Sequence, residues 1–417
     1  MKRGVLLLIL LLAGCEKATE PNIDLPTRSF ENRVGTVFTP LPVDLFKAPS
    51  IKEIQLPQRD SIDAIWGATG RDDEGYIYIG TSSHGGSYGS AFLYQYNPLT
   101  KEIVPQSDVV SQLKYNKVYR KGMRQNKLHS KFYQANDGYL YFSSFDEGGE
   151  AEGVNPTWGG NLWRKKPHDE NWQHLLATEE ALVGVNTNGR YVYALGYWDH
   201  VLYQFDTQTG EFNRVVVGSV KKHVSRNFIV DELGHAYVPQ LKENDFNEIE
   251  AYLVEYDTHL NKVASYPMPS YQGDNINAHH GIVGYTSMKN GDIFFTTSEG
   301  SLLQIKPFVQ GINKLNNRGL MHPDGEAYIA SLFTFAGESY ISGVGRIKGT
   351  NKYEWLIYEV NSGLAANYAL NTDAYQGLLL YGSLTKNKAG DFVVVGWNKK
   401  QGTTGYQPIL LTLSSDL

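Results

Sequence analysis

LHSKFYQANDGYLYFSSF, residues 128–145, carries the pattern on which the fold prediction rests. The stretch opens with a polar segment that contains His129, turns at Asn136, Asp137 and Gly138, and continues as an alternating run of aromatic and aliphatic residues. Such a turn followed by period-two apolar alternation indicates two strands joined by a tight connection. The pattern returns at a spacing of about 40 to 50 residues, which is typical of a propeller.

Seven copies of this unit can be read along the chain. The alternating runs are predicted as the second strands of seven units, at residues 75–80, 138–143, 190–195, 234–239, 291–296, 338–343 and 390–395. A further apolar run follows each of them as a third strand, at residues 91–96, 161–164, 201–206, 252–257, 301–305, 355–359 and 408–413. Because one such sheet cannot bury both of its faces alone, radial stacking of the units is favoured.

The predicted fold is therefore all-β, a seven-bladed β-propeller of four-stranded antiparallel blades. No segment shows a sustained helical apolar period, which disfavours a mixed α/β fold. The last unit ends at its third strand, so we expect an N-terminal strand at about residues 35–42 to supply its outer strand and close the ring. A β-sandwich is the alternative architecture.

The N-terminus reads as a targeting segment rather than as part of the fold. Residues 1–14 combine a basic start with a short apolar run, and the segment ending at Cys15 looks like the lipobox of bacterial lipoproteins. We expect Cys15, the only cysteine, to be lipidated, with residues 15–31 as a tether and residues 32–417 as the propeller. Glu16 after the cysteine resembles sorting to the outer membrane or cell surface of a Gram-negative bacterium; a plain signal peptide is the alternative.

Composition limits the partners. The formal net charge is −6, which argues against a nucleic-acid partner, so an anionic substrate would need a local basic cleft. We expect a monomer, and the single cysteine excludes an intrachain disulfide.

Blade geometry sorts the histidines by face. In a four-stranded antiparallel blade, the start of the innermost strand and the loop between the second and third strands lie on the same face. Seven of the eleven histidines fall in those two places, namely His84, His129, His200, His223, His279, His280 and His322. Histidine is the side chain best suited to proton transfer near neutral pH, although each could also be structural.

Three adjacent blades are predicted to line one side of a cleft on this face. They supply His129 and Lys131, then Tyr197, Trp198 and His200, then His223, Arg226 and Asn227. A guanidinium can pair bidentately with a carboxylate and Trp198 can stack on a sugar ring, so the cluster predicts binding of an acidic sugar. An ion pair between Arg226 and Asp231 is the structural alternative.

These features together resemble the seven-bladed propeller polysaccharide lyases that act on ulvan. The resemblance rests on the lipoprotein start, the blades, His129 in LHSKFYQANDGYLYF, Arg226 in SRNFIVDELGHAYVP, and the segment HPDGEAY that begins at His322. It implies β-elimination at a uronic acid, with Arg226 against the carboxylate and His129 and a tyrosine moving the protons. Tyr197 is the tyrosine assigned to this role, and Tyr271 is nearly as plausible.

The sequence departs from that family in one loop. A second histidine is expected after the second strand of the blade that carries His129, but residues 145–153 read FDEGGEAEG. His84 or His200 would have to replace it from a neighbouring blade. The departure favours a rival interpretation, a surface lipoprotein that binds glycans without cleaving them.

No redox cofactor is needed for this chemistry, and a bound Ca²⁺ or Zn²⁺ would be structural or would bind the carboxylate. The adjacent His279 and His280 could contribute a ligand, but neighbouring residues of a strand point in opposite directions. A metal-dependent lyase of pectic fragments, with several of these histidines on one ion, is the second rival.

Overall fold

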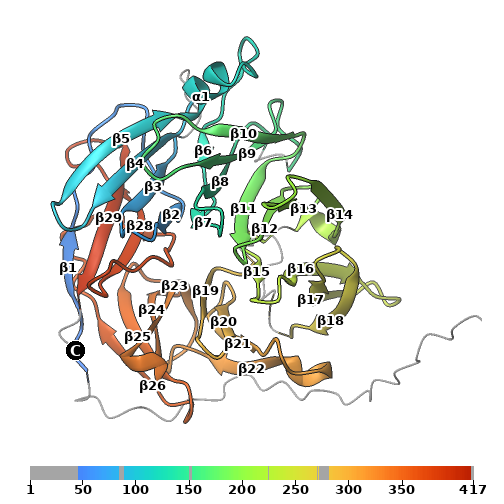
Figure 1. The fold of residues 1–417 in the computed structure, drawn as a ribbon. Coiled ribbons are helices and arrows are strands. Elements are labelled where there is room, and N and C mark those ends of the chain that lie inside the picture. The colour runs from blue at the N-terminus through green and yellow to red at the C-terminus, as the bar shows by residue number, and fades with distance from the viewer. Residues whose placement is uncertain are drawn as a thin grey trace, which may run out of the picture. The chain divides into compact units, whose positions relative to one another are not determined.

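Four-stranded antiparallel sheets account for the repeated strand pairs of the sequence. The computed structural model describes residues 46–83, 89–149, 153–223, 225–269, 271 and 281–414, all within the unit Gly35–Leu417. In these residues the strands form seven sheets around a common centre (Figure 1). The predicted all-β, seven-bladed propeller is confirmed.

The strands nearest the centre vary in length, and in four of the seven sheets they are only two or three residues long. They are β2 (Thr69–Arg71), β6 (Lys127–Leu128) with β7 (Tyr133–Gln134), β11 (Leu182–Thr187), β15 (Ile229–Val230), β19 (Gly284–Ser287), β23 (Ala327–Phe335) and β27 (Leu379–Leu380). The second strands are β3 (Ile77–Thr81), β8 (Leu140–Phe145), β12 (Tyr191–Gly196), β16 (Ala236–Glu243), β20 (Ile293–Thr296), β24 (Tyr340–Ile347) and β28 (Phe392–Lys399). Each second strand matches a predicted run.

The third strands confirm the remaining repeats, and the outer strands complete each sheet. The third strands are β4 (Phe92–Asn97), β9 (Gly160–Lys165), β13 (Val201–Asp206), β17 (Ile249–Tyr256), β21 (Ser301–Ile305), β25 (Tyr353–Glu359) and β29 (Tyr406–Ser414). The outer strands are β5 (Glu102–Asp108), β10 (Gln173–Thr178), β14 (Phe212–Val216), β18 (Lys262–Pro267), β22 (Leu315–Leu320), β26 (Ala365–Ala369) and β1 (Ser50–Glu53).

Helices in the described part of the chain are short and lie in connections. α1 (Val109–Tyr115) follows β5 directly, and the carboxylate of Asp108 caps it by accepting a hydrogen bond from the Ser111 amide at 3.0 Å. The 3-10 turns are η1 (Val220–Lys222), η2 (Gly311–Lys314) and η3 (Ala336–Glu338). No described helix is long and apolar enough to cross a membrane.

Apolar packing between neighbouring sheets holds the ring together. β3 and β8 are buried along their whole length, whereas β14 is largely exposed, because a second strand is covered on both faces and an outer strand is not. The cluster that joins the first and last blades packs Ile77 and Ile79 against Val393 and Val395. Burial of this kind is the main term that favours the folded state.

An N-terminal strand closes the ring, but it is not the predicted one. β1 pairs antiparallel with β29, with Ile51 opposite Leu413, and completes the sheet β1-β29-β28-β27. The predicted residues 35–42 lie outside the described residues. The observed strand suits an outer position because its exposure alternates and its half-buried Ile51 packs on the core of the last two blades.

Candidate functional site

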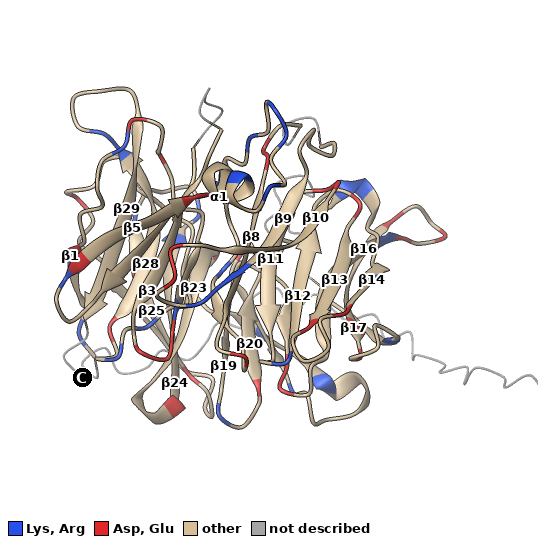
Figure 2. Ribbon diagram, turned by 45° about the horizontal axis from the view of Figure 1, so that its top comes forward, with Lys and Arg blue, Asp and Glu red and all other residues tan. Residues whose placement is uncertain are grey.

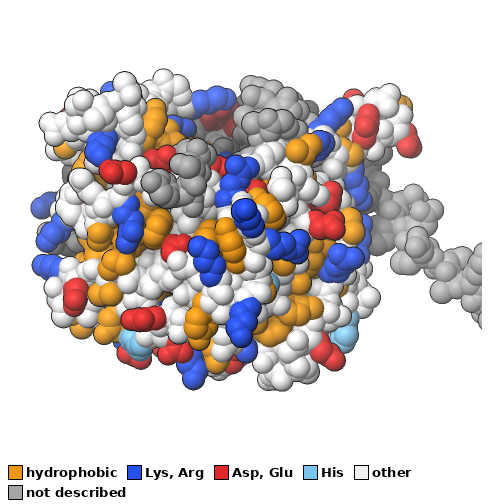
Figure 3. Space-filling view, turned by 90° about the horizontal axis from the view of Figure 1, so that it is seen from above, with side chains coloured by type: hydrophobic (Ala, Val, Ile, Leu, Met, Phe, Trp, Pro, Cys, Tyr) orange, Lys and Arg blue, Asp and Glu red, His pale blue; other side chains and the backbone are white. Residues whose placement is uncertain are grey.

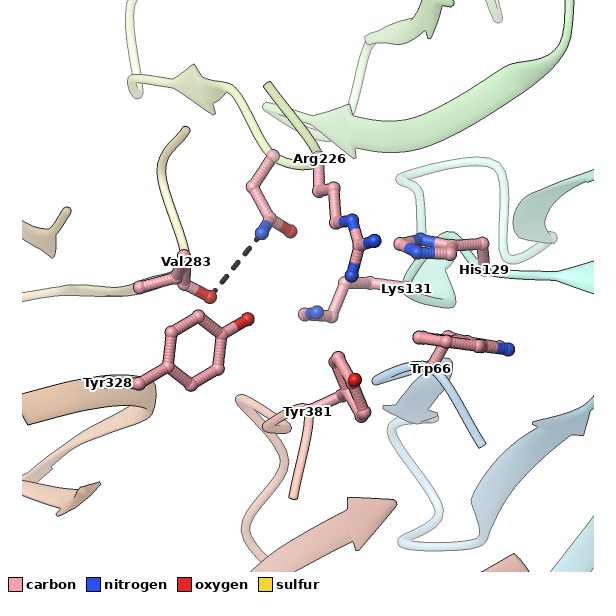
Figure 4. A pocket seen from close by; sticks show the side chains of 8 residues that line it. Trp66, His129, Lys131, Arg226, Val283, Tyr328 and Tyr381 are labelled. Carbon is pink, nitrogen blue, oxygen red and sulfur yellow. Dashed lines mark hydrogen bonds between the residues drawn. The ribbon is translucent and has the colours of Figure 1, made fainter. Parts of the chain in front are cut away.

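A pocket lies where the innermost strands begin, and six of the seven blades contribute to it (Figure 4). Its lining residues are Trp66, His129, Lys131, Arg226, Asn227, Val283, Tyr328 and Tyr381. The pocket is small, with about 260 Å³ of empty space when open solvent is included.

An interruption of the innermost strand of blade two delivers His129 and Lys131 to the pocket. β6 and β7 both pair with β8, but the four residues between them face only two residues of β8. Ser130 Oγ accepts a hydrogen bond from the Ser143 amide at 2.8 Å. The two extra residues form a bulge, and a bulge re-aims side chains. The polar start of the motif is therefore the part that reaches the site.

Trp66 forms the aromatic floor of the pocket, against which His129 and Arg226 both lie. The His129 ring is stacked on it, with centroids 6.1 Å apart and an interplanar angle of 14°. The Arg226 guanidinium carbon lies 5.4 Å from the Trp66 ring centroid and 5.8 Å from that of Tyr381. Cations within about 6 Å of an aromatic face are attracted by the ring quadrupole. This arrangement holds Arg226 with its fork directed into the pocket (Figure 4).

Lys131 is a basic residue whose side chain is buried in the pocket wall. Its side chain is only 6% exposed, and burial lowers the pKa of its ammonium to about 8. Gly67 adopts φ +86°, and a Cβ there would lie 3.2 Å from Lys131 Nζ, so a glycine is required beside the ammonium. None of the eight lining residues is acidic. The pocket is therefore cationic and suited to an anionic group.

Two phenols complete the opposite wall. Burial raises the pKa of both Tyr328 and Tyr381, and the Arg226 charge acts in the other direction on each. Both side chains are therefore neutral phenols at moderate pH and can donate a proton or a hydrogen bond. Figure 4 shows them across the pocket from His129.

A hydrogen-bonded pair of tyrosines crosses the centre beyond the pocket. The hydroxyls of Tyr133 in β7 and Tyr285 in β19 bond to each other, and each residue lies two positions past a lining residue, Lys131 or Val283. Asn186 Nδ2 lies 3.3 Å from the Tyr285 hydroxyl. This bridge links blades two and five across the ring.

Asn227 and Arg226, both predicted site residues, lie in the pocket together with His129 and Lys131. Asn227 Nδ2 donates to the carbonyls of Ile282 at 2.8 Å and Val283 at 3.4 Å, which braces the wall between blades four and five. Asp231, the alternative partner of Arg226, lies at the other end of β15 and accepts a hydrogen bond from the Tyr237 hydroxyl at 2.8 Å.

The blade-three candidates lie outside the pocket lining. Tyr197 is 5% exposed and packs between Phe145 and Trp198, with ring centroids 6.2 and 5.0 Å away. His200 is buried with Nδ1 3.2 Å from the Gly218 carbonyl, and burial lowers its pKa to about 4. Neither side chain is among the residues that line the pocket.

The other predicted residues are distributed around this face. His223 Nε2 lies 2.9 Å from the Tyr271 hydroxyl, and His322 Nε2 lies 2.8 Å from a Glu354 carboxylate oxygen. His84, His279, His280 and Cys15 lie outside the described residues. Within the described ranges no group of three or more His, Cys, Asp or Glu side chains could hold a metal ion.

Sequence reasoning missed Trp66, Tyr328 and Tyr381. Trp66 stands three residues before its innermost strand, the same place that Arg226 holds before β15, and Tyr328 is the last residue of the HPDGEAY segment. Applying the face argument to aromatic residues as well as to histidines would have found the first two. Tyr381 follows a two-residue strand that leaves no periodic signal.

Comparison with known proteins supports the fold. No family model matches the sequence, and no curated protein does. The structure of U3-55K matches with a TM-score of 0.55 at 8% identity, over 88% of this chain and 99% of that one. The β-propeller domain of Cps50 (Swd1) from Myceliophteria thermophila matches at 0.51 and 11% identity, over 86% and 99%. Hydrazine synthase from Kuenenia stuttgartiensis matches at 0.50 and 10%, over 85% and 97%.

Proposed function

We propose that this seven-bladed propeller is a polysaccharide lyase that cleaves an anionic, uronic-acid-containing polymer such as ulvan by β-elimination. The observation that carries the proposal is the composition of the pocket. Arg226 and Lys131 supply positive charge, His129 and the phenols of Tyr328 and Tyr381 supply proton-transfer groups, and no lining residue is acidic.

Neutralising the carboxylate is the first requirement of the reaction. The proton at C5 of a uronate is α to a carboxylate, so its removal places further negative charge on a group that is already anionic. A fixed cation beside the carboxylate offsets that charge. Arg226 can pair bidentately with the carboxylate, and Lys131 adds a second positive charge to the pocket.

Proton transfer would follow from the remaining groups. His129 takes the C5 proton, the electron pair forms the C4–C5 double bond, and the C4–O bond breaks. A phenol of Tyr328 or Tyr381 protonates the leaving oxygen, which suits groups whose raised pKa keeps them neutral. The pocket tyrosines take the role that the sequence assigned to Tyr197, because Tyr197 does not line the pocket.

The N-terminal segment supports a location for this activity. Cys15 at the end of the lipobox-like segment would hold the enzyme on the outer membrane or cell surface through its lipid. Polymers too large to enter the cell would meet it there.

A glycan-binding protein without lyase activity is the second candidate. One observation favours it, namely that the loop after β8 places two acidic residues where the family has a histidine. Asp146 pairs with Arg124 at 3.0 Å and Glu147 pairs with Lys127 at 2.9 Å. Such a protein would bind the anionic sugar in the cationic pocket without removing its C5 proton.

Ultraviolet absorbance of the unsaturated product separates the two candidates. The protein is incubated with ulvan, pectin and alginate, and we expect absorbance to rise with a uronate polymer. His129→Ala should abolish the signal, and Arg226→Lys should lose most of it because an ammonium cannot form the bidentate pair. His259→Ala, on an exposed turn, is the matched control and should remain active. No signal with any polymer would exclude the lyase proposal.

A further inference from the structure

A run of basic residues leads from the edge of the ring to the pocket. Between Asp108 and Asp137 the sequence contains no acidic residue and seven basic ones, Lys114, Lys117, Arg120, Lys121, Arg124, Lys127 and Lys131. The whole chain carries a net charge of −6, so this stretch is strongly basic within a chain that is acidic overall. We call residues 114–131 the basic segment.

Topology places the basic segment across the face that holds the pocket. The chain leaves β5, the outer strand of blade one, passes through α1 and reaches β6 at the centre of blade two. Since an outer strand ends and an innermost strand begins on the same face, the connection crosses that face from rim to centre. Figure 2 shows basic residues on α1 and in the nearby loops, and Figure 3, which looks onto the rim of the ring, shows Lys and Arg side chains with Asp and Glu side chains among them.

The outer half of the basic segment is exposed, and its charge is not neutralised by the described residues. Lys114, Lys117, Arg120 and Lys121 are all exposed, and none forms an ion pair with a residue in the described ranges. Charges of one sign in such a row repel one another and favour an anionic ligand.

The inner half of the basic segment joins the pocket directly. Arg124 and Lys127 are paired with Asp146 and Glu147, and Lys127 Nζ also lies 4.6 Å from the ring centroid of Trp66, the pocket floor. Lys131 is itself a lining residue. One stretch of chain therefore connects the exposed charges at the edge of blade one with Lys131 in the pocket, and Asp146 and Glu147 offset the two charges between them.

We propose that the basic segment binds the negative groups of an anionic polysaccharide outside the pocket, so that the polymer lies over the junction of blades one and two with one unit in the pocket. The inference rests on the proposed function for the identity of the polymer. Tyr115, which is 60% exposed, adds an aromatic surface beside the charges, against which a sugar ring can pack.

A polymer fits these observations better than an anionic membrane. A membrane surface could contact the exposed lysines of the outer half, but it could not reach Lys131, which is 6% exposed at the inner end of the same charged run. A flexible chain can follow the segment from the exposed end into the pocket.

Charge removal in the outer half tests the inference. The variant Lys117→Gln, Arg120→Gln, Lys121→Gln is compared with Lys101→Gln, Lys289→Gln, Lys388→Gln, whose lysines are exposed on turns of the opposite face. Binding to ulvan is measured by electrophoresis through polymer-containing native gels. We expect about tenfold weaker binding for the first variant at low salt, a difference that shrinks at high salt, and wild-type binding for the control.

Two further measurements keep this inference separate from the lyase proposal. Polymer binding by the wild type without unsaturated product, weakened only in the first variant, would support the basic segment and reject the lyase. Equal ulvan binding and product formation by both variants would overturn the inference and leave the lyase intact. If the first variant no longer bound phosphatidylglycerol vesicles but bound ulvan as well as the wild type does, the inference would be overturned in favour of a membrane contact.

Discussion

Replacing Lys131 with methionine should stabilise the protein while weakening its site. The ammonium is buried, and its pKa falls from the usual 10.5 to about 8. That difference corresponds to roughly 3 kcal/mol of folding free energy. Met retains most of the aliphatic volume without the charge, so Lys131→Met should raise the free energy of unfolding at neutral pH by up to about 3 kcal/mol.

The pH dependence of this gain has a defined sign. Because the pKa of Lys131 is lower in the folded than in the unfolded state, the charged form opposes folding, fully so below about pH 8. The penalty disappears as the pH rises from 8 towards 10.5, where the unfolded chain also loses the proton. The advantage of Lys131→Met should therefore fall to less than half between about pH 7 and about pH 9.5.

Urea unfolding at the two pH values measures this gain, and polymer binding measures its cost. Lys127→Met is the matched control; it should destabilise the protein, because it removes the ion pair with Glu147. A polyanion should stabilise the wild type more than it stabilises Lys131→Met. Burial removes the water that would solvate the Lys131 ammonium, and a bound anion supplies a charge partner in its place. A Lys131→Met protein that is less stable than the wild type, or a gain independent of pH, would refute the reasoning.

Three other perturbations test the frame around the site. Tyr133→Phe should lower the free energy of unfolding by about 1 kcal/mol through loss of the hydrogen bond to Tyr285, measured by urea unfolding, and an unchanged midpoint would contradict the bridge. Deletion of residues 50–53 should lower the melting temperature by an amount equivalent to about 2–4 kcal/mol, because β29 loses its partner strand; equal melting temperatures after deletion of residues 36–40 and of residues 50–53 would argue against β1 as the closing strand. Glu180 is buried and its pKa is raised to about 7, so Glu180→Gln should give a stability gain that grows as the pH rises from 4.5 to 7; a gain that is equal at both pH values would contradict this burial effect.

The repeated strands could be predicted from sequence because burial constrains them strongly. A second or third strand covered on both faces must be apolar along its length, so β8 and its counterparts stand out against the turns beside them. The innermost strands do not stand out, since β6, β15 and β27 are two residues long. Most of the pocket is built from these short strands and the residues next to them, which explains why its aromatic members were missed.

The site was predicted in part for a related reason. Facing rules identify which side of the ring a residue occupies but not its distance from the centre. His129, Arg226 and His200 satisfy the same rule, yet the bulge in blade two carries His129 inward while His200 packs under its own loop. The closing strand was predicted at residues 35–42, whereas β1 (Ser50–Glu53) is four residues long and alternates between exposed and half-buried positions, which gives little apolar signal.

The distribution of the pocket residues also bears on how the protein is made. Trp66 belongs to the first blade and Tyr381 to the last, so the pocket brings together groups separated by most of the polypeptide. No nascent or truncated fragment that lacks the final blade can possess the complete site. A ligand that needs every lining residue of the pocket can therefore bind only after the last blade has been synthesised and has folded against the first.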